Sequence, residues 1–367
     1  MSQARGLVDW SLAERVAAGI SGGLGGLTGD QGHGSGYTQA EVSAACAESI
    51  GVAAAHTGLG AVELPPVPEL IGRREWAANA LATLAQASPP LEQRIGAEMR
   101  LTGALGSIAR RAVGAGAAVE AGVAVGYVAR HVLGQYDLAL FGPRRPARLL
   151  FVAENMAAAQ RELDADRLLF LHWVALHETT HVVQLERVPW LSEHLRELAG
   201  ELLAGAARGL DPASLRELGR GVVRDPRGLV QAALHGELTR LLADPEMRTV
   251  LDRLQATMST IEGHAEHVMD TAASALGPGV DELRLRLDRR RARRSGLGGV
   301  IGRLLGIDLK LQQYALGKAF CDAVVAAAGA DALRLAWRSA DDLPSLAELE
   351  QPRLWLARVD GRSRQPA

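Results

Sequence analysis

Apolar residues in this 367-residue chain recur mostly at the spacing of helices. This pattern predicts helices over residues 8–20, 38–56, 75–86, 91–111, 191–208, 247–276 and 307–328. The second of these opens with Thr38 and carries Glu41 three residues later, the arrangement of a capping box. Helix formers dominate the composition, and the expected fold is therefore mainly α, within the α+β class.

One segment departs from the helical pattern. Residues 148–153 read Arg-Leu-Leu-Phe-Val-Ala, a short apolar run that predicts a strand. A short helix over 154–163 should follow, and then a long apolar helix, capped by Asp164 or Asp166, that stops before Pro189. We expect the strand to lie beside the long helix and to be an edge strand that holds an extended peptide by strand addition.

The prolines at 143 and 146 suggest a boundary near residue 145. They divide the chain into a helical N-terminal region, residues 1–145, and a second region, residues 146–367. The two regions are expected to be either separate or packed as one compact unit.

Charge and composition limit the classes of partner. The net charge is −2, which gives no general electrostatic attraction to nucleic acid or to an anionic membrane. An arginine-rich run over 281–294 lacks interleaved aromatic residues and is interpreted as a solvated helix or loop. The stretch 112–129 is rich in Ala and Gly and contains Glu120, which favours a close-packed core helix over a membrane span.

The compartment is predicted from cysteine use and from the first residues. Cys46 and Cys321 are far apart in the sequence, and no disulfide framework is expected. The first sixteen residues lack the apolar run of a signal peptide. We therefore expect a cytoplasmic protein.

The long apolar helix contains His177, Glu178 and His181 in the order H-E-x-x-H. Positions i and i+4 share one face of a helix, so both imidazoles can reach a single ion. Glu178 is the only charged residue between Arg167 and Glu186. Two histidines and a glutamate in such an apolar helix would be costly to bury without a partner. The pattern thus predicts a Zn²⁺ site with Glu178 as the base that activates a water.

A third protein ligand is needed for a catalytic zinc. Glu262 ranks first, because Glu266 lies one turn later and could accept the Nδ1–H of a ligand histidine. Gly263, between them, would let another backbone approach this site closely. Three alternative ligands remain open: Glu201, His264 and His267.

The pairing of His-Glu-Thr-Thr-His at 177–181 with Glu-Gly-His-Ala-Glu-His-Val-Met-Asp at 262–270 resembles the uncharacterised zincin-like family of predicted zinc-dependent metallopeptidases. The resemblance extends over VDWSLAERVA near the start, VLGQYDLALFG at 132–142 and LGIDLKLQQYALGKAFCDAVV at 305–325, and so covers nearly the whole chain. One branch of this family is associated by genome context with the biosynthesis of a deazaflavin coenzyme, and the resemblance makes that branch a candidate for this chain.

The resemblance implies a zincin-like core, with a small sheet beside the H-E-x-x-H helix and a large helical surround, and makes residues 146–367 the catalytic region. It implies a gluzincin-type site: His177, His181 and Glu262 hold zinc, and Glu178 is the base. Other gluzincins carry an aspartate four residues after the ligand glutamate. Here that position holds the longer acid Glu266.

The expected function is that of a zinc metallopeptidase acting on a peptide, with Glu178 passing the water proton to the leaving amine. Two other functions remain open: a zincin-fold binding or scaffold protein with a non-catalytic metal, and a hydrolase of a small amide in coenzyme metabolism. Candidate donors to the developing oxyanion are Tyr127, Tyr136, His235 and Tyr314.

Overall fold

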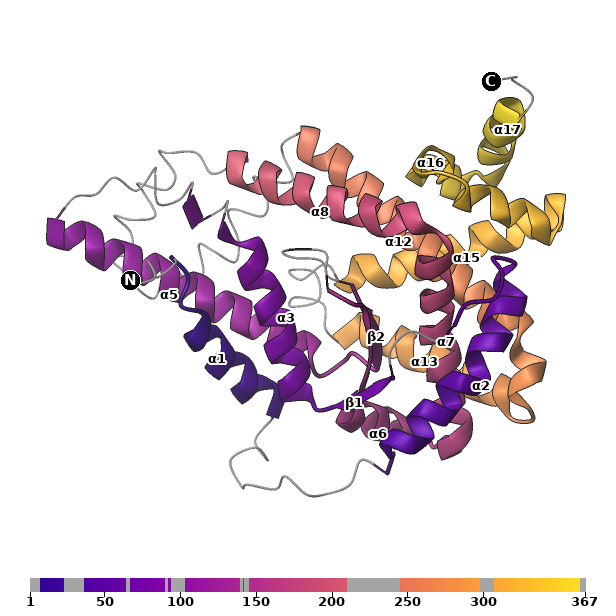
Figure 1. The fold of residues 1–367 in the computed structure, drawn as a ribbon, viewed down its shortest axis with the longest axis horizontal. Coiled ribbons are helices and arrows are strands. Elements are labelled where there is room, and N and C mark those ends of the chain that lie inside the picture. Colours follow the sequence, from indigo (N-terminus) through magenta and orange to yellow (C-terminus); the bar gives the residue numbers. More distant parts are fainter. Residues whose placement is uncertain are drawn as a thin grey trace.

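A three-stranded sheet lies between two groups of helices in the computed structural model (Figure 1). The structure describes residues 7–22, 36–63, 67–89, 92–93, 103–138, 141, 145–209, 245–297 and 307–363. The mainly α fold with a small sheet, expected from the sequence, is confirmed. In chain order the elements are α1 (Trp10–Gly22), α2 (Gln39–Thr57), β1 (Glu69–Ile71), α3 (Arg73–Ala87), α5 (Gly103–Val128), β2 (Gly134–Asp137), β3 (Arg148–Val152), α6 (Ala153–Glu162), α7 (Arg167–Arg187), α8 (Pro189–Gly209), α12 (Pro245–Thr271), η2 (Ala273–Leu276), α13 (Val280–Leu297), α15 (Ile307–Ala328), η3 (Ala330–Trp337), η4 (Ala340–Asp342), α16 (Leu346–Glu350) and α17 (Pro352–Ser363).

The strand order is β1-β3-β2, with β1 parallel and β2 antiparallel to β3. The predicted strand at 148–152 therefore exists, but its prediction as an edge strand is wrong, because both of its edges are already hydrogen-bonded. The two flanking strands have only three and four residues, too few for a clear alternating pattern. Pairing with the strongly apolar β3 orders them.

Strand β3 is buried on both faces, which explains its unbroken apolar sequence. Leu149 and Phe151 belong to the hydrophobic core that also contains α2 and α7. Leu150 and Val152 belong to a second core, built with α1, α3 and α5. Successive side chains of β3 thus point alternately into the two cores, so this one strand connects the helices α2 and α7 with the helices α1, α3 and α5.

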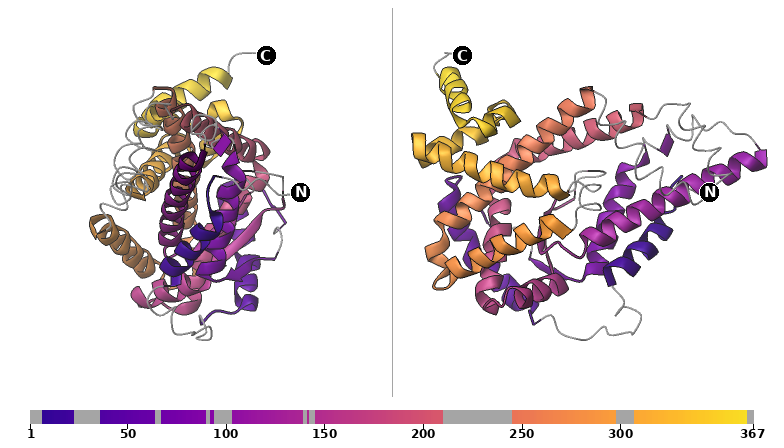
Figure 2. Two further views of the ribbon diagram at one scale, coloured as in Figure 1. Left: turned by 90° about the vertical axis from the view of Figure 1, so that its left-hand side faces the viewer. Right: turned by 180° about the vertical axis from the view of Figure 1, so that it is seen from behind.

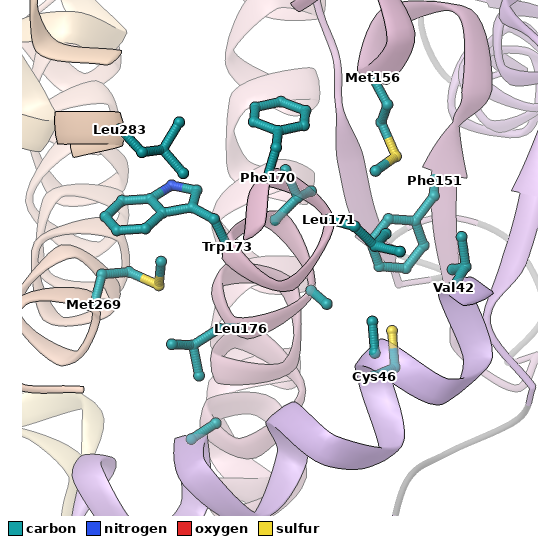
Figure 3. Packing of buried hydrophobic residues seen from close by; sticks show 14 of the residues in the cluster. Val42, Cys46, Phe151, Met156, Phe170, Leu171, Trp173, Leu176, Met269 and Leu283 are labelled. Carbon is teal, nitrogen blue, oxygen red and sulfur yellow. The ribbon is translucent and has the colours of Figure 1, made fainter. Parts of the chain in front are cut away.

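Helix α7 runs through the first core. Its N-terminus is capped by Asp166, whose carboxylate accepts a hydrogen bond from the Leu169 amide at 2.9 Å. Figure 3 shows Trp173 beside Met269 and Leu283, while Leu171 points toward Phe151 on the other side of the helix. Because apolar side chains surround it, α7 is held in a fixed position relative to the sheet and to α12.

The alanine- and glycine-rich stretch forms the second half of α5, which packs against α1 (Figure 2). A Cβ at Gly122 would lie 2.6 Å from the Ala13 carbonyl oxygen, and one at Gly126 would lie 2.9 Å from that of Ala17. The predicted close packing is therefore confirmed, but α5 is not enclosed in the core, because Val119, Glu120 and Val123 on its other face are exposed. None of the described helices combines the length and apolar character needed to cross a membrane.

The arginine-rich run forms helix α13, which is tied to the rest of the protein by ion pairs. Arg290 Nε lies 2.8 Å from Glu162 of α6, and Arg284 pairs with Asp270 of α12. Leu283 and Leu287 on the same helix are buried. These arginines therefore take part in docking α13 onto α6 and α12.

The suggested boundary near residue 145 falls between β2 and β3, which pair in one sheet. In addition, β1 and α2, from the N-terminal side of this boundary, pack on β3 and α7. The division into residues 1–145 and 146–367 as folding regions stays a prediction.

Candidate metal centre

His177 and His181 lie one turn apart on α7 and direct the same ring nitrogen toward one point. Their Nε2 atoms are 3.2 Å apart, and the two rings meet edge to face with centroids separated by 4.7 Å. The i, i+4 spacing of a helix is enough to bring these rings together.

The third side chain comes from α12, which packs against α7. Glu262 Oε2 lies 3.6 Å from His177 Nε2 and 3.4 Å from His181 Nε2. A tetrahedral zinc ion with bonds of about 2.1 Å holds its ligand atoms about 3.4 Å apart. The three separations lie close to this value, so His177, His181 and Glu262 could serve as ligands of one zinc ion.

The position of Glu262 depends on a close helix crossing behind it. Gly263 and Gly317 bring α12 and α15 into backbone contact, and a Cβ at Gly263 would lie 2.1 Å from the Gly317 carbonyl carbon. The close approach of another backbone expected at Gly263 is therefore confirmed. The glycine pair sets the depth at which α12 presents its carboxylate to α7.

The local field favours a positive charge at this point. Burial lowers the pKa of His181, but the carboxylates of Glu262 and Glu178 outweigh burial and raise this pKa to about 9. A cation bound between these groups would meet the same attraction. The carboxylates therefore provide an electrostatic reason for the site to bind a metal ion.

Glu178 is buried in α7 beside the ligand histidines, and strand β2 leaves room for its side chain. A Cβ at Gly134, the first residue of β2, would lie only 2.6 Å from Glu178 Cγ and 2.8 Å from its Oε1. The absence of a side chain at Gly134 is what permits the present conformation of Glu178.

Comparison with known proteins agrees with this geometry. The model of the family described as zincin-like metallopeptidase matches residues 8–356. The chain belongs to this family. No curated protein matches it.

One solved structure, from Chloroflexus aurantiacus, is similar to this chain over its whole length. It is described as "a putative hydrolase with a novel fold". The identity is 29%, the alignment covers 98% of this chain and 100% of the other, and the TM-score is 0.67. Both comparisons place this zincin-like protein among hydrolases at the level of the family.

The alternative ligands proposed from the sequence are engaged elsewhere in this family member. Glu201 on α8 lies 2.9 Å from Arg253 of α12. His267 Nδ1 lies 2.8 Å from Asp322 of α15. His264 is buried and makes a 3.1 Å hydrogen bond with Gln184. Among the described residues, the one group with metal-binding geometry consists of His177, His181 and Glu262 and includes none of these three.

Two groups near the site have partners on other helices. Burial lowers the pKa of His264 to about 3, and the neighbouring His267 and His181 act in the same direction, which keeps His264 neutral. Glu266 is buried one turn after Glu262, with Oε2 3.8 Å from Arg284 Nη2. Its role as the acid that orients a ligand histidine stays a prediction.

The candidate oxyanion donors are only partly described. Tyr136 Oη donates to Glu186 at 2.5 Å, and Tyr127 packs against the ring of His131 at 4.5 Å. His235 and the side chain of Tyr314 lie outside the described residues. The assignment of an oxyanion donor therefore stays a prediction.

Two residues of the site were not identified from the sequence. Gln184 follows His181 by three residues, and its side chain reaches His181 Nδ1 at 2.8 Å. The sequence did contain a clue to this role: Gln184 is a polar residue in an otherwise apolar helix, and it lies on the same helix face as His177 and His181. For Gly134 the only clue was an isolated glycine in a short polar segment. Its role can be recognised only when β2 is known to pair with β3, because this pairing places Gly134 against Glu178.

Proposed function

We propose that this protein is a zinc-dependent metallopeptidase that hydrolyses amide bonds. The observation that carries the proposal is the convergence of His177, His181 and Glu262 at separations suited to zinc, with Glu178 next to them in the same buried helix. Membership of the zincin-like metallopeptidase family supports the same conclusion.

His177, His181 and Glu262 would hold the zinc ion, with two neutral nitrogen ligands and one carboxylate. When bound, zinc would polarise the scissile carbonyl and lower the pKa of a bound water toward about 7. Glu178 would accept a proton from the attacking water and donate it to the leaving amine. Gly134 leaves free the space that the Glu178 side chain occupies, because a Cβ there would collide with it.

A peptide substrate is supported by the sheet. Among the described strands, β1 and β2 are the two edges of the sheet, and β2 starts at Gly134, directly against Glu178. An extended peptide could pair with an edge of this kind through its main chain. Such pairing would bring an amide bond of the substrate close to the general base, whereas β3 has no free edge to offer.

The test combines metal content, cleavage and one conservative substitution. Purified wild type should contain one zinc per chain by elemental analysis and should cleave members of a peptide library, monitored by mass spectrometry. Glu178→Gln should keep the zinc and lose about 10²–10⁴-fold in rate, because the base is gone and the ligands remain. Glu14→Gln, the same change at an exposed position of α1, is the matched control and should keep wild-type activity.

Different results would point to the other functions. Stoichiometric zinc with no cleavage of peptides or small amides would favour a binding or scaffold protein. Cleavage of small amides but not of peptides would favour a role in coenzyme metabolism. A wild type without zinc, whose activity does not change in His177→Ala, would overturn the proposal.

A further inference from the structure

Gln184 is fully buried in α7, and its amide contacts both ligand-bearing helices. Its Oε1 lies 2.8 Å from His181 Nδ1. Its Nε2 lies 2.9 Å from the Ile261 carbonyl oxygen and 3.1 Å from His264 Nδ1. Two acceptors on α12 therefore face the two N–H groups of one amide, and the oxygen of that amide faces a metal-ligand candidate.

These contacts determine which end of the amide faces His181. The Ile261 carbonyl can only accept a hydrogen bond, so the group beside it must be the NH₂ of Gln184. Gln184 Oε1 then faces His181, and because this oxygen can only accept, His181 Nδ1 carries a proton. When the ring is neutral, its lone pair is therefore on Nε2.

His181 Nε2 is the atom that faces Glu262 Oε2 at 3.4 Å and His177 Nε2 at 3.2 Å. A proton held on Nδ1 thus directs the lone pair to the point where the three candidate ligands converge. The same amide also binds the backbone of Ile261, the residue before Glu262. One side chain therefore links the first ligand helix to the second at the level of the site.

We propose that Gln184 is a positioning residue: it fixes the tautomer and ring orientation of His181 for metal binding and holds α12 in register with α7. This inference rests on the proposed zinc site. A glutamate at 184 could still accept from His181, but it would turn a carboxylate oxygen toward the acceptors on Ile261 and His264. Only an amide satisfies all three contacts.

The experiment compares Gln184→Met and Gln184→Glu with wild type in the full chain. Zinc affinity is measured by competition with a chelator, and thermal stability is measured without metal. Gln184→Met has the same length but accepts no strong hydrogen bond, and it should bind zinc about 10–100-fold more weakly. Gln184→Glu should recover most of the zinc affinity while its stability falls. Gln160→Met on α6, where the amide donates to Ala165, is the matched control and should keep wild-type zinc affinity.

A purely structural role predicts the opposite pattern, because zinc affinity would then follow stability in both variants. Such a result, or an unchanged affinity in Gln184→Met, would overturn the inference and leave the proposed function intact. Nitrogen-15 NMR of labelled histidine gives a second measurement: the Nδ1 proton of His181 should exchange slowly in wild type and rapidly in Gln184→Met. The same difference in proton exchange is expected in metal-free protein. The inference can therefore be tested even if wild type binds no zinc and the proposed function fails.

Discussion

Helices α7 and α12 both contribute to the candidate metal centre, but they position their residues by different means. In α7 the two histidines are one turn apart, and helix geometry alone brings their Nε2 atoms to 3.2 Å. In α12, Glu262 reaches the same point only because that helix packs against α7 on one side and crosses α15 at Gly263 and Gly317 on the other. The first arrangement is local, and the second depends on contacts between distant parts of the chain.

This difference teaches where the site is vulnerable. A small movement of α7 and α12 relative to each other would leave the histidine pair intact but separate Glu262 from both histidines. Protein interiors are close-packed, so a change of one methyl group at a helix crossing can cause such a movement. Substitutions far from any metal ligand can therefore test the comparison.

The largest effect is expected at the crossing of α12 and α15. In Gly263→Ala, the added Cβ would meet the backbone of Gly317 at about 2.1–2.4 Å, so one of the two helices must shift. We expect a loss of about 3 kcal/mol in the free energy of unfolding, measured with urea, together with weaker zinc binding. Gly200→Ala on α8, a helical glycine where an added Cβ would meet no other atom within 4 Å, should be neutral or slightly stabilising. Equal effects in the two variants would contradict the proposed dependence on packing.

A smaller effect on catalysis is expected at Gly134, which tests the α7 side of the comparison. In Gly134→Ala the methyl group would displace Glu178 while leaving His177 and His181 in place. Since a misplacement of about 1 Å can cost about 10²-fold in rate, kcat should fall about 10–100-fold with zinc content unchanged. Steady-state kinetics and elemental analysis of the same sample would show whether kcat falls while the zinc content stays unchanged. A loss of zinc in Gly134→Ala would mean that β2 supports the ligands rather than the base.

The smallest effect is expected at the start of α7, where Arg167 Nη2 lies 2.7 Å from Glu41 of α2. Hydrogen bonds from Arg167 and from the Thr38 amide lower the pKa of Glu41 from 4.5 to about 2. A lowered pKa in the folded state stabilises the protein above pH 4.5, and the contribution is lost as pH falls through about 2. The contribution is modest, because the pair is exposed to solvent.

The difference in unfolding free energy between wild type and Glu41→Gln should therefore shrink as the pH falls from 6 to 2. A double-mutant cycle with Arg167→Ala, at pH 6 and at pH 2, isolates the part due to this pair. A difference that does not change with pH would show that the ion pair contributes nothing to the docking of α7 on α2.

Much of the fold could be predicted because its signals are local. The capping box of Thr38 and Glu41 is present at the start of α2, and Asp166 caps α7. The strand at 148–152 was also predictable from its apolar run. Its place in the middle of the sheet was not, because β1 and β2 are short, polar in part, and ordered only by pairing with it.

The sequence by itself determined that His177 and His181 share one helix face with Glu178 beside them, since the geometry of a helix depends only on spacing along the chain. Only the tertiary structure decided that Glu262, rather than Glu201, His264 or His267, meets the two histidines. It also placed Gln184 against Ile261, and Gly134 against Glu178. These contacts join residues from 44 to 85 positions apart, and they depend on how whole helices and strands pack, which no local pattern encodes.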